Sequence, residues 1–264
     1  MTEQSCVPVF QFLTNHLEFG NFPKSQKVDS NGRCVLQHGL SASQSIISVK
    51  GEGLASALKN GWLPKSVVMA ANLAEAVNIK APFNTPRTDE ALLMQVVARR
   101  DEARRSLNVD EMRIMFGDTL FQLKLEANGV SLGSREQAES SILGARVSVL
   151  KLEWRGARET MEMPFSQRDV VEVRKAVLTF AENAPVTAMS AKSRSALQAF
   201  VGASSEAKGR FQLELVENSD VSIGQMVVAL QRLNNSNEDG AKTKEAVSLA
   251  FGDAKFEATW EPLN

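Results

Sequence analysis

A short sequence pattern occurs twice in this chain, 135 positions apart, and it constrains the architecture more than any other feature. Residues 116–126 read FGDTLFQLKLE and residues 251–261 read FGDAKFEATWE, so five of eleven positions are identical. Internal repetition indicates related structural units, and the offset is close to half of the 264-residue length. We therefore expect two related α+β halves, residues 1–130 and 131–264. The alternative is one compact domain whose strands reuse Phe and Glu by chance.

Runs of alternating apolar residues on either side of a dipeptide that contains glycine predict three β-hairpins, because glycine takes the positive φ that tight turns require. The predicted hairpins cover residues 112–125, 150–165 and 247–260, with turns at Gly117-Asp118, Arg155-Gly156 and Gly252-Asp253. Single strands are predicted at 7–13, 34–37, 46–49 and 210–217, and residues 20–33 have the composition of a loop.

Apolar residues at helical spacing predict helices that pack against these hairpins. Two of the helix starts have the form of a capping box, with Ser166 before Asp169 and Ser222 before Gln225. The predicted fold class is therefore α+β, with antiparallel hairpins packed against helices. The predicted helices cover residues 52–59, 64–77, 86–107 and 166–184, then 193–201 and a segment from Ser222 onward.

Composition and cysteine content suggest an ordinary folded protein. Hydrophobic residues make up 43% and charged residues 23% of the chain, and the net charge is −1, which gives enough apolar surface for a core and no strong charge bias. No segment is apolar enough to span a bilayer, and the first residues do not read as a secretory signal. Cys6 and Cys34 are too few for a disulfide framework and predict two buried free thiols. We therefore expect a cytoplasmic protein, in a cell or in an infected host cell.

Most common catalytic and cofactor-binding patterns are missing from the sequence. Only His16 and His38 are available for acid-base work, and a Cys34–His38 nucleophilic pair is less favoured than a structural role for both residues. The sequence contains no glycine-rich phosphate loop and no cluster of residues with metal-ligand spacing. We therefore assign no catalytic residue and expect no cofactor and no metal.

Positive charge is concentrated in one part of the chain, around the predicted helix 86–107. A cation cluster on a helix face is suited to contact phosphates, although the neighbouring Asp101 and Glu102 halve the local charge. The alternative is an ordinary solvated helix face, in which acids and bases pair on the surface. The candidate nucleic-acid-binding residues are Arg99, Arg100, Arg104, Arg105 and Arg113.

Together these features predict binding rather than catalysis. The favoured hypothesis is a non-enzymatic protein that assembles with copies of itself through exposed sheet edges and holds nucleic acid on the basic helix. One alternative is an enzyme whose site contains Glu126, Arg113 and Asp118 and lacks histidine. The other is an adaptor or inhibitor that masks a protein partner.

Overall fold

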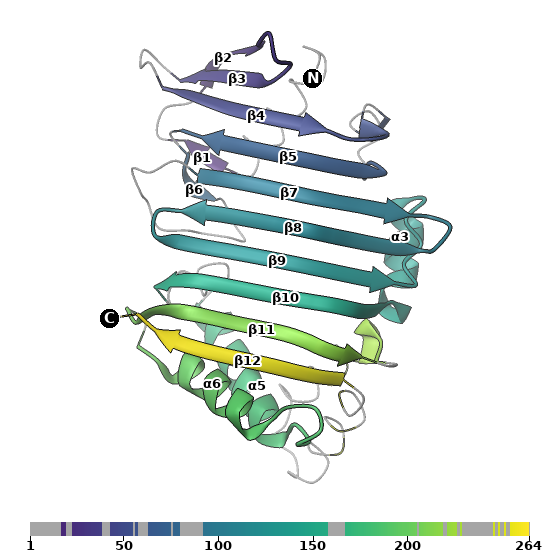
Figure 1. Ribbon diagram of the computed structural model, residues 1–264, viewed down its shortest axis with the longest axis vertical. Coiled ribbons are helices and arrows are strands. Elements are labelled where there is room, and N and C mark those ends of the chain that lie inside the picture. Colours follow the sequence, from purple (N-terminus) through teal and green to yellow (C-terminus); the bar gives the residue numbers. More distant parts are fainter. Residues whose placement is uncertain are drawn as a thin grey trace.

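The computed structural model is built around one broad antiparallel β-sheet (Figure 1). Its ten strands lie in the order β12-β11-β10-β9-β8-β7-β5-β4-β3-β2, so segments that follow one another in the chain are usually neighbours in the sheet. Strands β1 and β6 form a separate two-stranded sheet. The strands are β1 (Leu17–Phe19), β2 (Pro23–Val28), β3 (Cys34–His38), β4 (Gln44–Lys50), β5 (Ser66–Leu73), β6 (Ala76–Ile79), β7 (Leu92–Asp101), β8 (Ser106–Phe116), β9 (Thr119–Asn128), β10 (Arg146–Ala157), β11 (Lys208–Asn218) and β12 (Ala254–Pro262).

The described helices are few and lie behind the sheet in the view of Figure 1. They are α3 (Arg135–Ser141), the 3-10 turn η1 (Ile142–Gly144), α5 (Gln167–Asn183) and α6 (Ala191–Gly202). An α+β body of hairpins packed with helices is therefore the wrong fold class, because strands dominate and ten of them form one sheet. The structure describes residues 17–19, 23–38, 43–54, 56–57, 63–74, 76–79, 92–157, 167–204, 206–218, 221–225, 228, 245, 248, 251 and 254–263.

The two faces of the sheet have different chemistry, because successive side chains of a strand point to opposite faces. On one face, polar residues of neighbouring strands lie opposite one another in a row that crosses the sheet. No described helix covers this face, which we call the open face; the other is the covered face. The row consists of Gln95, Arg113, Gln122, Glu153, Gln212 and Thr259.

The covered face carries the core, which forms separate clusters along the sheet. The largest cluster lies where α5 and α6 pack on β10, β11 and β12, and it is rich in aromatic rings. Phe200 of α6 stacks on Phe211 of β11 with ring centroids 4.2 Å apart, and Trp154 of β10 is 2% exposed. A second cluster is centred on β3, β4, β5 and β7, and a third joins α3 to the ends of β8 and β9.

The helices predicted at 64–77 and 86–107 are wrong, because β5 and β7 occupy these segments. Ala71 and Leu73, two positions apart on β5, are buried on the covered face, and the residues beside them in the strand are exposed, as the alternation of a strand requires. The open face of both strands also carries apolar residues: Val68 is 51% and Leu93 is 38% exposed. Apolar residues on both faces hide the period of two, and the remaining spacing resembles that of a helix.

Of the three predicted hairpins, only the first is confirmed. Strands β8 and β9 pair in antiparallel fashion around the Gly117-Asp118 turn, and Gly117 has the expected positive φ of 56°. The second turn is wrong, since β10 runs straight through Gly156. The third hairpin lacks its first strand, because Phe251 has helical backbone conformation; Gly252 and Asp253 lie outside the described residues. The two copies of the repeated pattern therefore differ in local structure.

Several other sequence predictions agree with the structure. Strands β3, β4 and β11 and helices α5 and α6 are found where they were predicted. Of the two predicted capping boxes, the one at Ser222 is present: the backbone N–H of Gln225 donates to the Ser222 hydroxyl at 3.3 Å, and the Gln225 side chain accepts from the Ser222 N–H at 2.7 Å. Ser166 of the other lies outside the described residues. The loop predicted at 20–33 is wrong in part, because it contains β2. The strand predicted at 7–13 lies outside the described residues.

The division into halves 1–130 and 131–264 stays a prediction. The proposed boundary falls between β9 and β10, which pair along most of their length within the same sheet.

Candidate functional site

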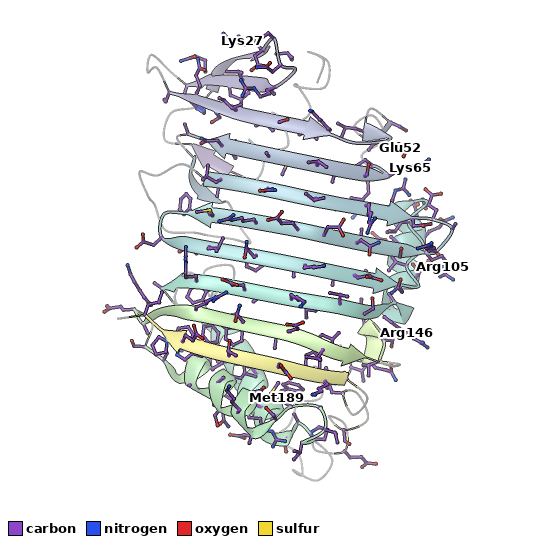
Figure 2. The ribbon with its side chains drawn as sticks, in the orientation of Figure 1. Lys27, Glu52, Lys65, Arg105, Arg146 and Met189 are labelled. Carbon is purple, nitrogen blue, oxygen red and sulfur yellow. The ribbon has the colours of Figure 1, made fainter. Side chains whose placement is uncertain are left out.

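A hollow of about 610 Å³ lies at one end of the central strands, beside the turn that joins β7 to β8. Four elements meet there: the segment before β5, the end of β7 with its turn, the start of β8 and the end of β9. Figure 2 shows Lys65, Arg105 and Arg146 along this same rim of the sheet. Four cationic and three acidic side chains line the hollow together with polar neutral ones: Lys65, Arg99, Arg100, Arg104, Asp101, Glu102, Glu126, Ser106, Asn108 and Asn128.

Arg99 and Arg104 are the cations most accessible to a ligand in this hollow. Their side chains are 65% and 85% exposed. Each guanidinium Nε lies near one carboxylate, Asp110 at 3.5 Å and Asp101 at 3.7 Å, which is longer than an ordinary hydrogen bond. Exposed ion pairs of this kind contribute about 0–1 kcal/mol, so a phosphate oxygen can replace the carboxylate at low cost.

Lys65 is held more firmly by its neighbour. Its ammonium lies 2.9 Å from a carboxylate oxygen of Glu52, and this hydrogen bond raises the pKa of Lys65. The pair lies at the rim of the sheet (Figure 2). Lys65 and Glu52 therefore form a neutral ion pair beside the hollow.

Arg100 and Arg105 have structural roles. The Arg100 side chain is 11% exposed, donates to the carbonyl oxygens of Pro64 and Leu132, and pairs with Glu102 at 2.7 Å. Arg105 occupies a left-handed backbone conformation with φ of 51° in the tight β7–β8 turn, and its guanidinium donates to the carbonyl of Gly129 at 3.1 Å. These bonds tie the turn to the neighbouring segments, so both residues position the hollow.

The structure separates Arg113 from the other predicted cations. Arg113 lies opposite Gln95 on β7, four residues before Arg99, or about 13 Å along the strand. The predicted basic helix does not exist, and the remaining four arginines gather because a strand end and a turn bring them to one rim. The polar residues contributed by β8 and β9 carry no signal in the sequence, because only strand pairing brings them to the hollow.

The cysteine and histidine considered for nucleophilic chemistry are structural. Cys34 is buried and disulfide-bonded, so the expectation of a free thiol at this position is wrong. Cys6 lies outside the described residues. His38 is fully buried, and its Nε2 lies 2.7 Å from the hydroxyl of Ser45, which in turn donates to the carbonyl of Ala74 at 3.0 Å. Since the Ser45 hydroxyl proton is used in this bond, the imidazole nitrogen donates to Ser45 instead of taking its proton.

The three residues of the carboxylate enzyme hypothesis do not converge. Asp118 and Glu126 lie at opposite ends of β9, eight residues or about 26 Å apart. Asp118 is paired with Lys208 at 2.9 Å, and this hydrogen bond lowers the pKa of its carboxyl. Arg113 belongs to the row in the middle of the sheet. An enzyme built on these three side chains has no support in this geometry.

Within the described residues, no three His, Cys, Asp or Glu side chains gather in an arrangement that could bind a metal ion. In the same part of the chain, every helix is too short or too polar to cross a bilayer.

Comparison with known proteins adds no name to this geometry: no protein-family model, no curated protein and no solved structure matches the chain.

Proposed function

We propose that this is a non-enzymatic binding protein that holds nucleic acid at the rim hollow between β5, β7, β8 and β9. The observation that supports the proposal most directly is the pair Arg99 and Arg104, whose side chains are exposed in the hollow. Arginine forks donate several N–H groups to phosphate oxygens, and exposed ones do so without a burial cost.

The polar neutral side chains of the hollow fit the same ligand. Asn108 lies opposite Arg99, and Ser106 lies opposite both Asp101 and Asn128, so hydroxyl and amide groups surround the cations. Hydroxyls and amides commonly contact phosphate and sugar oxygens. The lining carries four cations and three carboxylates, and Glu52 and Asp110, which pair with Lys65 and Arg99, add two more carboxylates beside it, so the positive charge is largely neutralised. We therefore propose weak binding that relies on two or three phosphate contacts.

The test is fluorescence anisotropy with labelled single-stranded DNA, duplex DNA and single-stranded RNA over a series of salt concentrations. Two to three phosphate contacts predict a slope of log K against log salt of about −2. The double variant Arg99→Glu/Arg104→Glu is expected to bind at least about tenfold more weakly at low salt. The matched control is Arg155→Glu/Lys255→Glu, which changes net charge equally at exposed positions of β10 and β12.

Equal affinities for the two double variants would show that only net charge matters and would remove the assignment to the rim. Absence of binding to all three nucleic acids at low salt would refute the proposed function itself.

Self-assembly remains part of the proposal, and the sheet edges limit how it can occur. The outer edge of β12 is partly occupied, because the N–H of Phe256 donates to the carbonyl of Ala188 at 2.7 Å. Pro262 near the end of this strand has no N–H to offer a neighbour. Strand addition at the other edge, β2, is therefore the route that we propose, and light scattering on the anisotropy samples measures whether a multimer forms.

A further inference from the structure

A second hollow, of about 550 Å³, lies on the open face across β4, β5, β7 and β8, with Arg33 at one end. Its character differs from that of the rim hollow. Ile46, Leu93 and Met115 give it apolar walls, and Asn72 and Gln95 contribute amide groups. Two cations line the hollow, Arg33 and Arg113, and of these only Arg113 lies on a strand.

Arg113 is left without a partner among the residues that the structure describes. Its Nε is buried and has no hydrogen-bond acceptor. Its cross-strand neighbours are the amides Gln95 and Gln122, not carboxylates. The acid nearest in the strand, Glu111, already accepts from the Gln95 amide at 3.1 Å. A buried donor without an acceptor is unusual in proteins, and no described residue occupies the rest of this guanidinium, whose terminal N–H groups a ligand can therefore use.

The other cation that lines this hollow is already paired. Arg33, which precedes β3, binds the Asp29 carboxylate through its Nε at 2.7 Å. The carboxyl of Asp29 also accepts from the backbone N–H groups of Asn31 and Arg33, and these bonds lower its pKa. Arg33 therefore marks the end of the hollow and leaves Arg113 as the group that selects the ligand.

We propose that this hollow binds an acidic peptide segment, with a carboxylate on the guanidinium of Arg113 and an adjacent apolar side chain against Leu93 and Met115. One available cation between apolar walls fits one carboxylate flanked by apolar groups. A nucleic-acid strand, by contrast, needs several cations along its backbone. The amides of Asn72 and Gln95 can bond to the peptide backbone. This site is separate from the rim hollow, so either proposal can fail while the other holds.

The test uses the full chain labelled with ¹⁵N and a pair of capped peptides, acetyl-leucyl-aspartyl-leucine amide and its asparaginyl counterpart. The Nε–H resonance of Arg113 is assigned by its disappearance in Arg113→Lys. We expect this resonance to shift to saturation with the aspartyl peptide and the asparaginyl peptide to bind about tenfold more weakly, because it lacks the charge-assisted bond. Equal binding of the two peptides, or no saturable shift with either, would overturn the proposal without any variant being made.

Variants then locate the site. Arg113→Gln is expected to weaken the aspartyl peptide about tenfold, measured on the side-chain amide resonances of Asn72 and Gln95. Arg113→Lys keeps the charge but loses the planar fork, so its affinity should fall between the two. Arg155→Gln, an exposed arginine of β10 outside the hollow, is the control and should bind normally. A short oligonucleotide that shifts the Arg113 resonance when the peptide does not would reassign the hollow to nucleic acid and overturn the peptide proposal.

Discussion

Replacing Gly209 with alanine tests how tightly the aromatic core is closed at the end of β11. Gly209 lies opposite Gly156 of β10 and Pro262 of β12, and the indole of Trp260 lies directly over it. A Cβ built on Gly209 would be 2.1 Å from Cη2 of Trp260 and 2.5 Å from Cζ3. Ordinary van der Waals contact begins at 3.4 Å, so the ring would have to retreat by 3.4 − 2.1 = 1.3 Å.

The expected cost follows from what holds this ring. Trp260 stacks on Trp154 with centroids 6.5 Å apart and lies against Phe200 at 5.1 Å. Each aromatic pair contributes about 0.5–1.5 kcal/mol, so displacing the ring from both costs about 1–3 kcal/mol. Keeping the ring in place with the added methyl costs a similar amount through overpacking, about 1–3 kcal/mol. Without this overlap, Gly→Ala would stabilise by about 0.4–1 kcal/mol, because alanine has less freedom in the unfolded chain. The two expectations therefore differ in sign.

The measurement is urea unfolding followed by circular dichroism and by tryptophan fluorescence. Gly209→Ala should destabilise by about 1–3 kcal/mol in the native background and by clearly less in Trp260→Leu, where the clashing ring atoms are gone. Gly202→Ala is the control, because a Cβ there meets no atom within 4 Å. A stabilised Gly209→Ala, or an equal cost in both backgrounds, would refute the reasoning.

Two further predictions concern the open face and the disulfide. Glu153 accepts both N–H groups of the Arg210 fork at 2.8 Å, which lowers the pKa of its carboxyl below 4.5. The stabilisation from this pair should be present above the ordinary glutamate pKa and be lost as the pH falls through the lowered pKa. Urea unfolding should therefore show the free energies of unfolding of the native protein and Glu153→Gln converging as the pH is lowered through the acidic range; a constant difference would contradict this. Cys34 is disulfide-bonded and the chain has two cysteines. Thiol titration in guanidinium chloride should therefore find no reactive thiol before reduction and two after it. A thiol detected before reduction would contradict the disulfide, and a non-reducing gel shows whether the disulfide joins two chains.

Local signals in the sequence located some elements well. The Gly117-Asp118 turn was predictable because alternating residues on both sides leave one short connection and glycine supplies the positive φ. Helices α5 and α6 were predictable because their apolar residues follow helical spacing and Pro185 lies just after α5. Strands β5 and β7 were not predictable, because Val68 and Leu93 are apolar residues on the solvent-exposed face and interrupt the alternation of apolar and polar residues that marks a half-buried strand.

The candidate site was predictable in part for a related reason. A cluster of arginines is visible in any sequence, and four of the five do gather at one rim. Which of them is accessible was not predictable, because Arg100 is held by carbonyl groups of Pro64 and Leu132, far from it in the chain. The isolation of Arg113 in a second hollow likewise depends on strand register, which the repeated pattern did not reveal.

The order of strands also bears on how the chain folds. Strands β8 and β9 each pair with the strand that precedes them across a short turn, so these two pairings cost little chain entropy; β10 pairs with β9 only after the connection that contains α3. Pairing of β7, β8 and β9 can therefore begin before β11 and β12 have been synthesised. The pairing of β10 with β11 spans α5 and α6, and the aromatic cluster also needs β12, so we expect this cluster to consolidate after the β7–β9 pairings.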